Sequence, residues 1–249
     1  MDNLLDQCRW PPLTAPYDQA LRDAVQWIVA RFEVLGIVAS GTIIRGNPKP
    51  ASDLDIYVIH AQPRRQRIQT FFNGIPAEIF VNPVSAIERY FIAEHKAGRP
   101  LTAHMLATGF VVLDRDPIVE DLRQRARDLI AERSDPAATQ LTMLRYSAAL
   151  ELEDALDVVA TDSATANMIL GMAVRHMLQF RFWMAHQPLP RDKDLFEALD
   201  TLDPRLVTRA RDFFMASEVE WRTALAKEMA DLTIEAHGFF EWESPLEDV

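Results

Sequence analysis

The sequence has little cysteine: Cys8 is the only one among 249 residues. A single cysteine excludes an intramolecular disulfide and any zinc site built from several thiolates, and it favours the reducing cytoplasm. Long apolar runs are also missing. No segment approaches the roughly 20 apolar residues that cross a bilayer, and the first residues lack the basic and apolar regions of a signal peptide. We therefore expect a soluble, cytoplasmic protein with no membrane partner.

Basic side chains are scarce as well. The 26 lysines and arginines face 37 aspartates and glutamates, which gives a formal net charge of -11. Non-specific affinity for nucleic acid comes largely from cationic contacts to phosphate, so this balance argues against stable nucleic-acid binding. A cationic partner is easier to accommodate. Hydrophobic residues make up 49% of the chain, which is enough to fill a real core.

The first half of the chain combines strand and helix signals. Apolar periodicity and turn residues predict strands at residues 37–39, 53–59, 75–81 and 110–113. They predict helices at residues 17–34, 84–97, 101–108 and 117–133. Gly36 is expected to mark the end of the first helix, residues 41–50 a loop, and residues 61–67 a polar connection that precedes a turn at Asn73-Gly74.

Strand signals disappear beyond Ser134-Asp135-Pro136, a turn and helix start where we place a domain boundary. The helices expected after it span residues 136–160, 163–187, 191–200 and 204–236. The predicted fold is therefore α+β: an N-terminal domain at residues 1–133, with a small mixed sheet flanked by helices, and an all-α helical bundle at residues 134–249.

Two aspartates, Asp53 and Asp55, open the second predicted strand. Side chains at i and i+2 of a strand share one face and lie about 6 to 7 Å apart along the backbone. Two carboxylates on one face suit Mg²⁺, which takes few protein carboxylates and completes its shell with water and phosphate oxygens. Glu78, alone in the third strand, would add a third carboxylate if the two strands pair. Three carboxylates so close together require a cation.

The segment before these aspartates has the features of a phosphate-binding loop. Gly41-Thr42 offers backbone amides and a hydroxyl at a strand end, and Arg45 and Lys49 would partly neutralise a triphosphate. Ser52 is expected to fix the start of the second strand. An isolated Asp-x-Asp is usually a solvated strand end, and an isolated Gly-Thr an ordinary turn. The two together predict a metal and triphosphate site.

At these residues the sequence resembles the polymerase-β-like nucleotidyltransferase superfamily, whose pattern is Gly-Ser, Arg-Gly and then Ser-Asp-x-Asp on a strand. Here Gly41-Thr42, Arg45-Gly46 and Ser52-Asp53-Leu54-Asp55 fall in step without insertion. Thr42 replaces the serine and keeps the hydroxyl. The resemblance is closest to aminoglycoside-nucleotidyltransferase-like proteins, and it extends diffusely over about residues 20–235.

This resemblance implies transfer of a nucleoside monophosphate, most readily AMP from ATP, to a hydroxyl group, with release of pyrophosphate and with Mg²⁺ as cofactor. It makes Asp53, Asp55 and Glu78 the metal ligands, with Glu78 also a candidate general base. It makes Gly41, Thr42, Arg45, Lys49 and Ser52 the residues that bind the nucleotide.

The resemblance also assigns roles to the helical half, which covers the nucleotide in such enzymes. Glu151, Glu153 and Asp154 are candidate general bases on its first helix, and we prefer Glu151 at the edge of the apolar face. Lys193 is a candidate contact to a nucleotide phosphate. For each of these residues the ordinary alternative is a solvated surface charge. The six histidines show no pair at metal-ligand spacing and are expected to be non-ligands.

The expected acceptor is a small molecule, and an aminoglycoside-type antibiotic comes first because an acidic cleft attracts a polycation. That function would be antibiotic resistance. Two alternatives stay open: an AMPylating, antitoxin-like transferase that modifies a protein side chain, and a nucleotide-binding regulatory module without turnover. An intact set of three carboxylates speaks against the second. Many relatives build their site across a dimer, so the protein is expected to be either a monomer or a homodimer.

Overall fold

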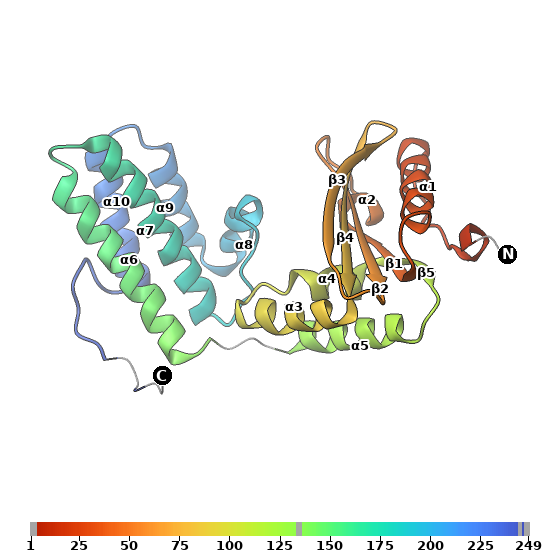
Figure 1. The fold of residues 1–249 in the computed structure, drawn as a ribbon. Helices are drawn as coiled ribbons and strands as arrows, with labels where there is room; N and C mark the ends of the chain where they lie inside the picture. Colours follow the sequence, from red (N-terminus) through yellow and green to blue (C-terminus); the bar gives the residue numbers. More distant parts are fainter. Residues whose placement is uncertain (1–3, 133–135, 244–245, 247–249) are drawn as a thin grey trace. The chain divides into compact units, whose positions relative to one another are not determined.

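The computed structural model describes residues 4–132, 136–243 and 246 (Figure 1). The chain forms two compact units, Met1–Arg133 and Ser134–Val249. Most of the predicted boundary turn, Ser134-Asp135, lies outside the described residues. The first unit contains a mixed sheet with helices and the second is helical, which confirms the predicted α+β fold class. None of the described helices combines the length and apolar character of a membrane span.

The first unit is built on a five-stranded sheet in the order β3-β4-β2-β1-β5. Its strands are β1 (Val34–Ser40), β2 (Leu54–His60), β3 (Gln66–Phe72), β4 (Ile75–Pro83) and β5 (Phe110–Asp114). β2 and β4 run parallel, and every other neighbouring pair in this sheet is antiparallel. β3 follows β2 in sequence but lies outside β4, so β2 and β4 begin at the same end of the sheet.

Alternate residues of the sheet enter two separate cores. Leu54, Ile56 and Val58 of β2 pack with helix α1, whereas Tyr57 and Ile59 pack with helices α3, α4 and α5 on the opposite face. These helices are α1 (Ala15–Val29), α3 (Val84–Lys96), α4 (Leu101–Thr108) and α5 (Ile118–Ala131). The strand period of two therefore sends the side chain of Asp55 to the face of α3, α4 and α5.

Three expectations for the first unit are wrong. Helix α1 ends at Val29, and Gly36 lies inside β1 at a register shift, where a Cβ atom would come 2.5 Å from Cγ2 of Val119. The expected loop 41–50 begins with the one-turn helix α2 (Gly41–Ile44). The connection after β2 ends early, because residues 66–72 form β3, which joins β4 through the predicted turn at Asn73-Gly74.

The second unit packs its helices around a core that includes Leu152, Met177, Phe213 and Met229. Its described α-helices are α6 (Ala138–Val158), α7 (Ser163–Met184), α8 (Leu195–Leu202), α9 (Pro204–Met215) and α10 (Val219–Thr233). The single helix expected at 204–236 is wrong. The chain turns at Ala216, which is extended (φ -64, ψ 138) and whose carbonyl accepts a hydrogen bond from Arg222 Nε at 2.9 Å. Residues 216–218 contain neither glycine nor proline, and the local signal was limited to Ser217 three residues before Glu220, the spacing of a capping box.

Candidate metal and nucleotide site

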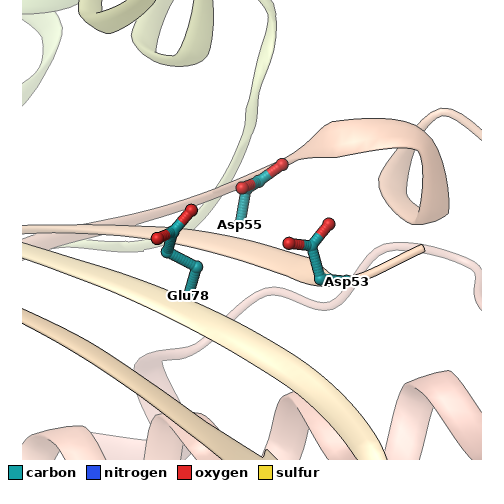
Figure 2. A group of neighbouring side chains, drawn as sticks. All are labelled: Asp53, Asp55 and Glu78. Atoms are coloured by element: carbon teal, nitrogen blue, oxygen red, sulfur yellow. The ribbon is translucent and has the colours of Figure 1, made fainter. Parts of the chain in front are cut away.

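The three carboxylates predicted to bind metal lie together at one end of the sheet (Figure 2). Asp53 immediately precedes β2, Asp55 is the second residue of β2, and Glu78 lies on β4. Asp55 and Glu78 are direct partners in the parallel β2–β4 pair, so their side chains project from the same face. One oxygen from each of the three residues lies within 4.8 Å of the others.

This cluster fits a divalent cation. Oxygens bound to one Mg²⁺ at its usual bond length are separated by about 3 to 4 Å, so small shifts would bring the three carboxylates into one coordination shell. The donors are hard carboxylate oxygens, which favour Mg²⁺ or a similar ion over the softer metals that prefer sulfur and imidazole. All three side chains are partly buried, and their mutual repulsion would be relieved by a cation.

Edge strand β3 holds the third carboxylate in place. Gln69 is the direct antiparallel partner of Glu78, and its Nε2 donates to Oε1 of Glu78 at 2.9 Å. Arg67 donates from Nε to the same oxygen at 2.6 Å, and its Nη2 completes the ion pair. Sequence reasoning missed both contacts because residues 66–72 were not assigned to a strand. The signal was present in the alternation of Arg67 and Gln69 with Ile68.

The segment between β1 and β2 passes close to the cluster. Gly41 has φ +91, and a Cβ atom there would lie 2.6 Å from Oδ2 of Asp55, so any other residue would be strained and would force the carboxylate or the chain to move. The hydroxyls of Thr42 and Ser52 are hydrogen-bonded at 2.7 Å. Ser52 Oγ also accepts from the backbone amide of Lys49 at 2.8 Å. Ser52 therefore joins the beginning of this segment to its end.

Arg45 and Lys49 lie in the same segment, and both are exposed. The structure thus gathers the predicted phosphate-binding residues Gly41, Thr42, Arg45, Lys49 and Ser52 on the short connection that leads into Asp53. Their contact with a triphosphate stays a prediction.

The other two predicted residues belong to the second unit. Glu151 on α6 is mostly buried, and its Oε2 lies 2.7 Å from Nδ1 of His176 on α7. The alternative base, Glu153, packs against Gly238, where an added Cβ atom would come 3.0 Å from its Cδ. Lys193 is exposed in the 3-10 turn Asp192–Asp194. The roles of Glu151 and Lys193 in base catalysis and phosphate binding stay predictions.

Comparison with known proteins supports the fold. No family model matches the chain, and no curated protein matches it significantly. Among solved structures, a nucleotidyltransferase-like protein from Exiguobacterium sibiricum 255-15 aligns with a TM-score of 0.54 and 16% sequence identity. The alignment covers 87% of this chain and 74% of that one. The chain therefore has a nucleotidyltransferase-like fold with a candidate carboxylate triad, and the aminoglycoside subgroup stays a prediction.

Proposed function

We propose that the protein is a Mg²⁺-dependent nucleotidyltransferase, which transfers a nucleoside monophosphate, first of all AMP from ATP, to a hydroxyl group. The observation that carries this proposal is the cluster of Asp53, Asp55 and Glu78 on a nucleotidyltransferase-like sheet. The approach of Gly41 to Asp55 adds to it, because a side chain at Gly41 would come 2.6 Å from the Asp55 carboxylate where the predicted phosphate loop meets the triad.

In the proposed reaction the acceptor hydroxyl oxygen forms a bond to the α-phosphorus. The bond from that phosphorus to the bridging oxygen breaks, pyrophosphate leaves, and the hydroxyl proton passes to a protein carboxylate. Asp53, Asp55 and Glu78 would hold Mg²⁺, which would offset the negative charge that develops on the reacting phosphate oxygens. Gly41, Thr42, Arg45 and Lys49 would orient the triphosphate, and the rate would come mainly from positioning and charge neutralisation.

We propose Glu78 first as a metal ligand, because it lies in the cluster with Asp53 and Asp55. Its Oε1 already accepts hydrogen bonds from Arg67 and Gln69, so Oε2 is left for either a metal or a proton. As the general base we propose Glu151, as the resemblance to aminoglycoside-nucleotidyltransferase-like proteins implies, with Glu153 and Glu78 as the alternatives. His176 restrains the Glu151 carboxylate, which favours Glu151 as a positioned proton acceptor.

We propose a small molecule as the acceptor. An aminoglycoside-type polycation comes first because the protein carries a net charge of -11, and antibiotic resistance would then be its role. The hydroxyl of a protein side chain is the second candidate, since it requires the same chemistry. A regulatory nucleotide-binding module is the third, and the intact triad argues against it. A monomeric or homodimeric cytoplasmic enzyme without a stable nucleic-acid partner completes the proposal.

The metal site is tested by calorimetric titration of ATP in Mg²⁺ and in EDTA. We expect wild-type protein to bind ATP much more tightly with Mg²⁺, and the double variant Asp53→Asn, Asp55→Asn to lose that dependence. Asp121→Asn, Asp128→Asn is the matched control, because it removes the same charge from exposed positions of α5 in the same unit. Unchanged metal dependence in the first double variant would refute the site.

The acceptor is tested by pyrophosphate release with each nucleoside triphosphate across a panel of aminoglycosides. Release that requires both substrates identifies the small-molecule activity. Transfer of labelled nucleotide to protein, with no release in the panel, would favour the protein acceptor. Tight metal-dependent ATP binding without transfer to any acceptor would favour the regulatory module.

A further inference from the structure

Arg67 lies beside the candidate metal site on the exposed face of β3. Ile68 and Phe72 of this strand pack with the core of α1, so Arg67 and Gln69 project from the opposite face, which carries the triad. The strand register pairs Gln69 with Glu78. Arg67 pairs with Phe80, and Phe80 pairs with Tyr57. These three residues therefore lie side by side on the same face of the sheet, next to the carboxylates.

Two independent contacts hold the Arg67 guanidinium. Its Nε and Nη2 both bond Oε1 of Glu78. Its Cζ lies 5.0 Å from the ring centroid of Phe80, which stacks on buried Tyr57 with centroids 5.9 Å apart and planes 11° from parallel. The side chain of Arg67 is 65% exposed. A surface arginine with a single partner would readily give up that partner for water. The ring below and the carboxylate beside it keep this positive charge in place.

The hydrogen bonds to Glu78 are one-sided. Among the described residues, Arg67 and Gln69 donate hydrogen bonds to this carboxylate, and both bond its Oε1. Oε2 is therefore the oxygen available to a cation, and coordination through both oxygens would require Glu78 to release Arg67.

We propose that Arg67 is a positioning residue that restricts Glu78 to coordination through one oxygen and lowers the affinity of the triad for a bare divalent cation. This inference rests on the proposed function. A fixed guanidinium next to the cation repels it and offsets one of the three carboxylate charges. A nucleoside triphosphate brings several negative charges, so a nucleotide-bound cation is affected far less. The site would thus take up metal together with nucleotide.

The test uses Mn²⁺ alone as the probe, with free Mn²⁺ measured by electron paramagnetic resonance. We expect Arg67→Gln to lower the Kd for Mn²⁺ about tenfold. The repulsion between a divalent ion and a unit charge a few ångströms apart in water-like surroundings has an energy that corresponds to about a tenfold change in Kd. Arg67→Lys keeps the charge and should stay within about threefold of wild type. Circular dichroism melting would verify that each variant is folded.

Arg65→Gln is the matched control. Arg65 lies two residues before Arg67, just ahead of β3, and its Nη1 donates to the hydroxyl of Tyr90 rather than to a carboxylate. Its removal takes away the same charge at a greater distance, so we expect less than about a twofold change in Kd. For the Mn²⁺–ATP complex, titrated calorimetrically into the protein, Arg67→Gln should shift the Kd by no more than about twofold.

The outcomes separate this inference from the function on which it rests. Unchanged or weaker Mn²⁺ binding in Arg67→Gln would overturn the inference, while wild-type binding that Asp55→Asn abolishes would still uphold the metal site. An equal gain in Arg65→Gln would also overturn it, since the effect would then be one of net charge. Absence of Mn²⁺ binding in wild type and in Arg67→Gln, with and without ATP, would refute the proposed metal site itself.

Discussion

Replacement of Gly41 by alanine tests the contact between the predicted phosphate loop and the triad. The added methyl group meets two obstacles. A residue with a side chain at φ +91 is strained by about 1 to 2 kcal/mol. Its Cβ atom would also lie 2.6 Å from Oδ2 of Asp55, a distance that real Cβ contacts do not reach, so the carboxylate or the loop must move. The variant should lose both stability and metal affinity.

The two effects can be separated with Gly46→Ala. Gly46 lies in the same connection at φ +75, and apart from its chain neighbours no described residue has an atom within 4 Å of a Cβ built there. Both variants should lower the free energy of unfolding by about 1 to 2 kcal/mol, measured by urea denaturation. Gly41→Ala alone should raise the Kd for Mn²⁺, by about 10- to 100-fold, the range seen when the support of a metal ligand is disturbed.

The comparison can fail in two ways. If Gly41→Ala binds Mn²⁺ as tightly as Gly46→Ala does, Asp55 is not held where the structure places it or is not a ligand. If Gly46→Ala loses metal affinity to the same extent, loop strain rather than the contact with Asp55 controls the site. Equal stability of wild type and both variants would refute the backbone argument.

Two further predictions concern the helical unit. Burial alone would raise the pKa of Asp203, but hydrogen bonds from the Leu206 amide and from Arg181 outweigh it and hold the pKa below its usual range. Asp203→Ala should lower the free energy of unfolding by about 1 kcal/mol near pH 7, through loss of the N-cap of α9. Because the folded pKa is depressed, this contribution is present above the usual pKa of an aspartate and should be lost as the pH falls through the folded pKa. Glu151→Gln should reduce turnover by at least about 100-fold at unchanged ATP affinity, and Glu153→Gln only mildly. Equal, mild losses of turnover in both variants would assign the role of general base to Glu78.

The position of Glu78 could be predicted from sequence because strand alternation is a strong constraint. Leu54 and Ile79 are apolar and fully buried, and the carboxylates beside them must therefore face the other way. The pairing of the two strands then brings Asp55 opposite Glu78. The local sequence predicts which face of the sheet each side chain occupies, and the expected strand pairing then brings the carboxylates together.

The neighbours of Glu78 carry a weaker signal, the alternation of Arg67 and Gln69 with Ile68. β3 is an edge strand with one face against α1, and its outward residues Arg67 and Gln69 are as polar as those of a loop. The assignment of Gly36 failed for a related reason: a glycine after a helix usually ends it, whereas here Val119 of a distant helix occupies the space of its side chain. At Gly36 the deciding contact comes from a segment remote in sequence.

The location of β3 outside β4 affects how this chain can change in evolution. The connection at residues 61–65 and the turn at Asn73-Gly74 lie between Asp55 and Glu78 in sequence, yet neither sets their pairing. Insertions there would preserve the triad, whereas a one-residue slip of β4 against β2 would turn Glu78 to the face of α1. Distant homologues should therefore conserve the strand order and the parallel register, while the number of residues separating the second aspartate from the third carboxylate drifts.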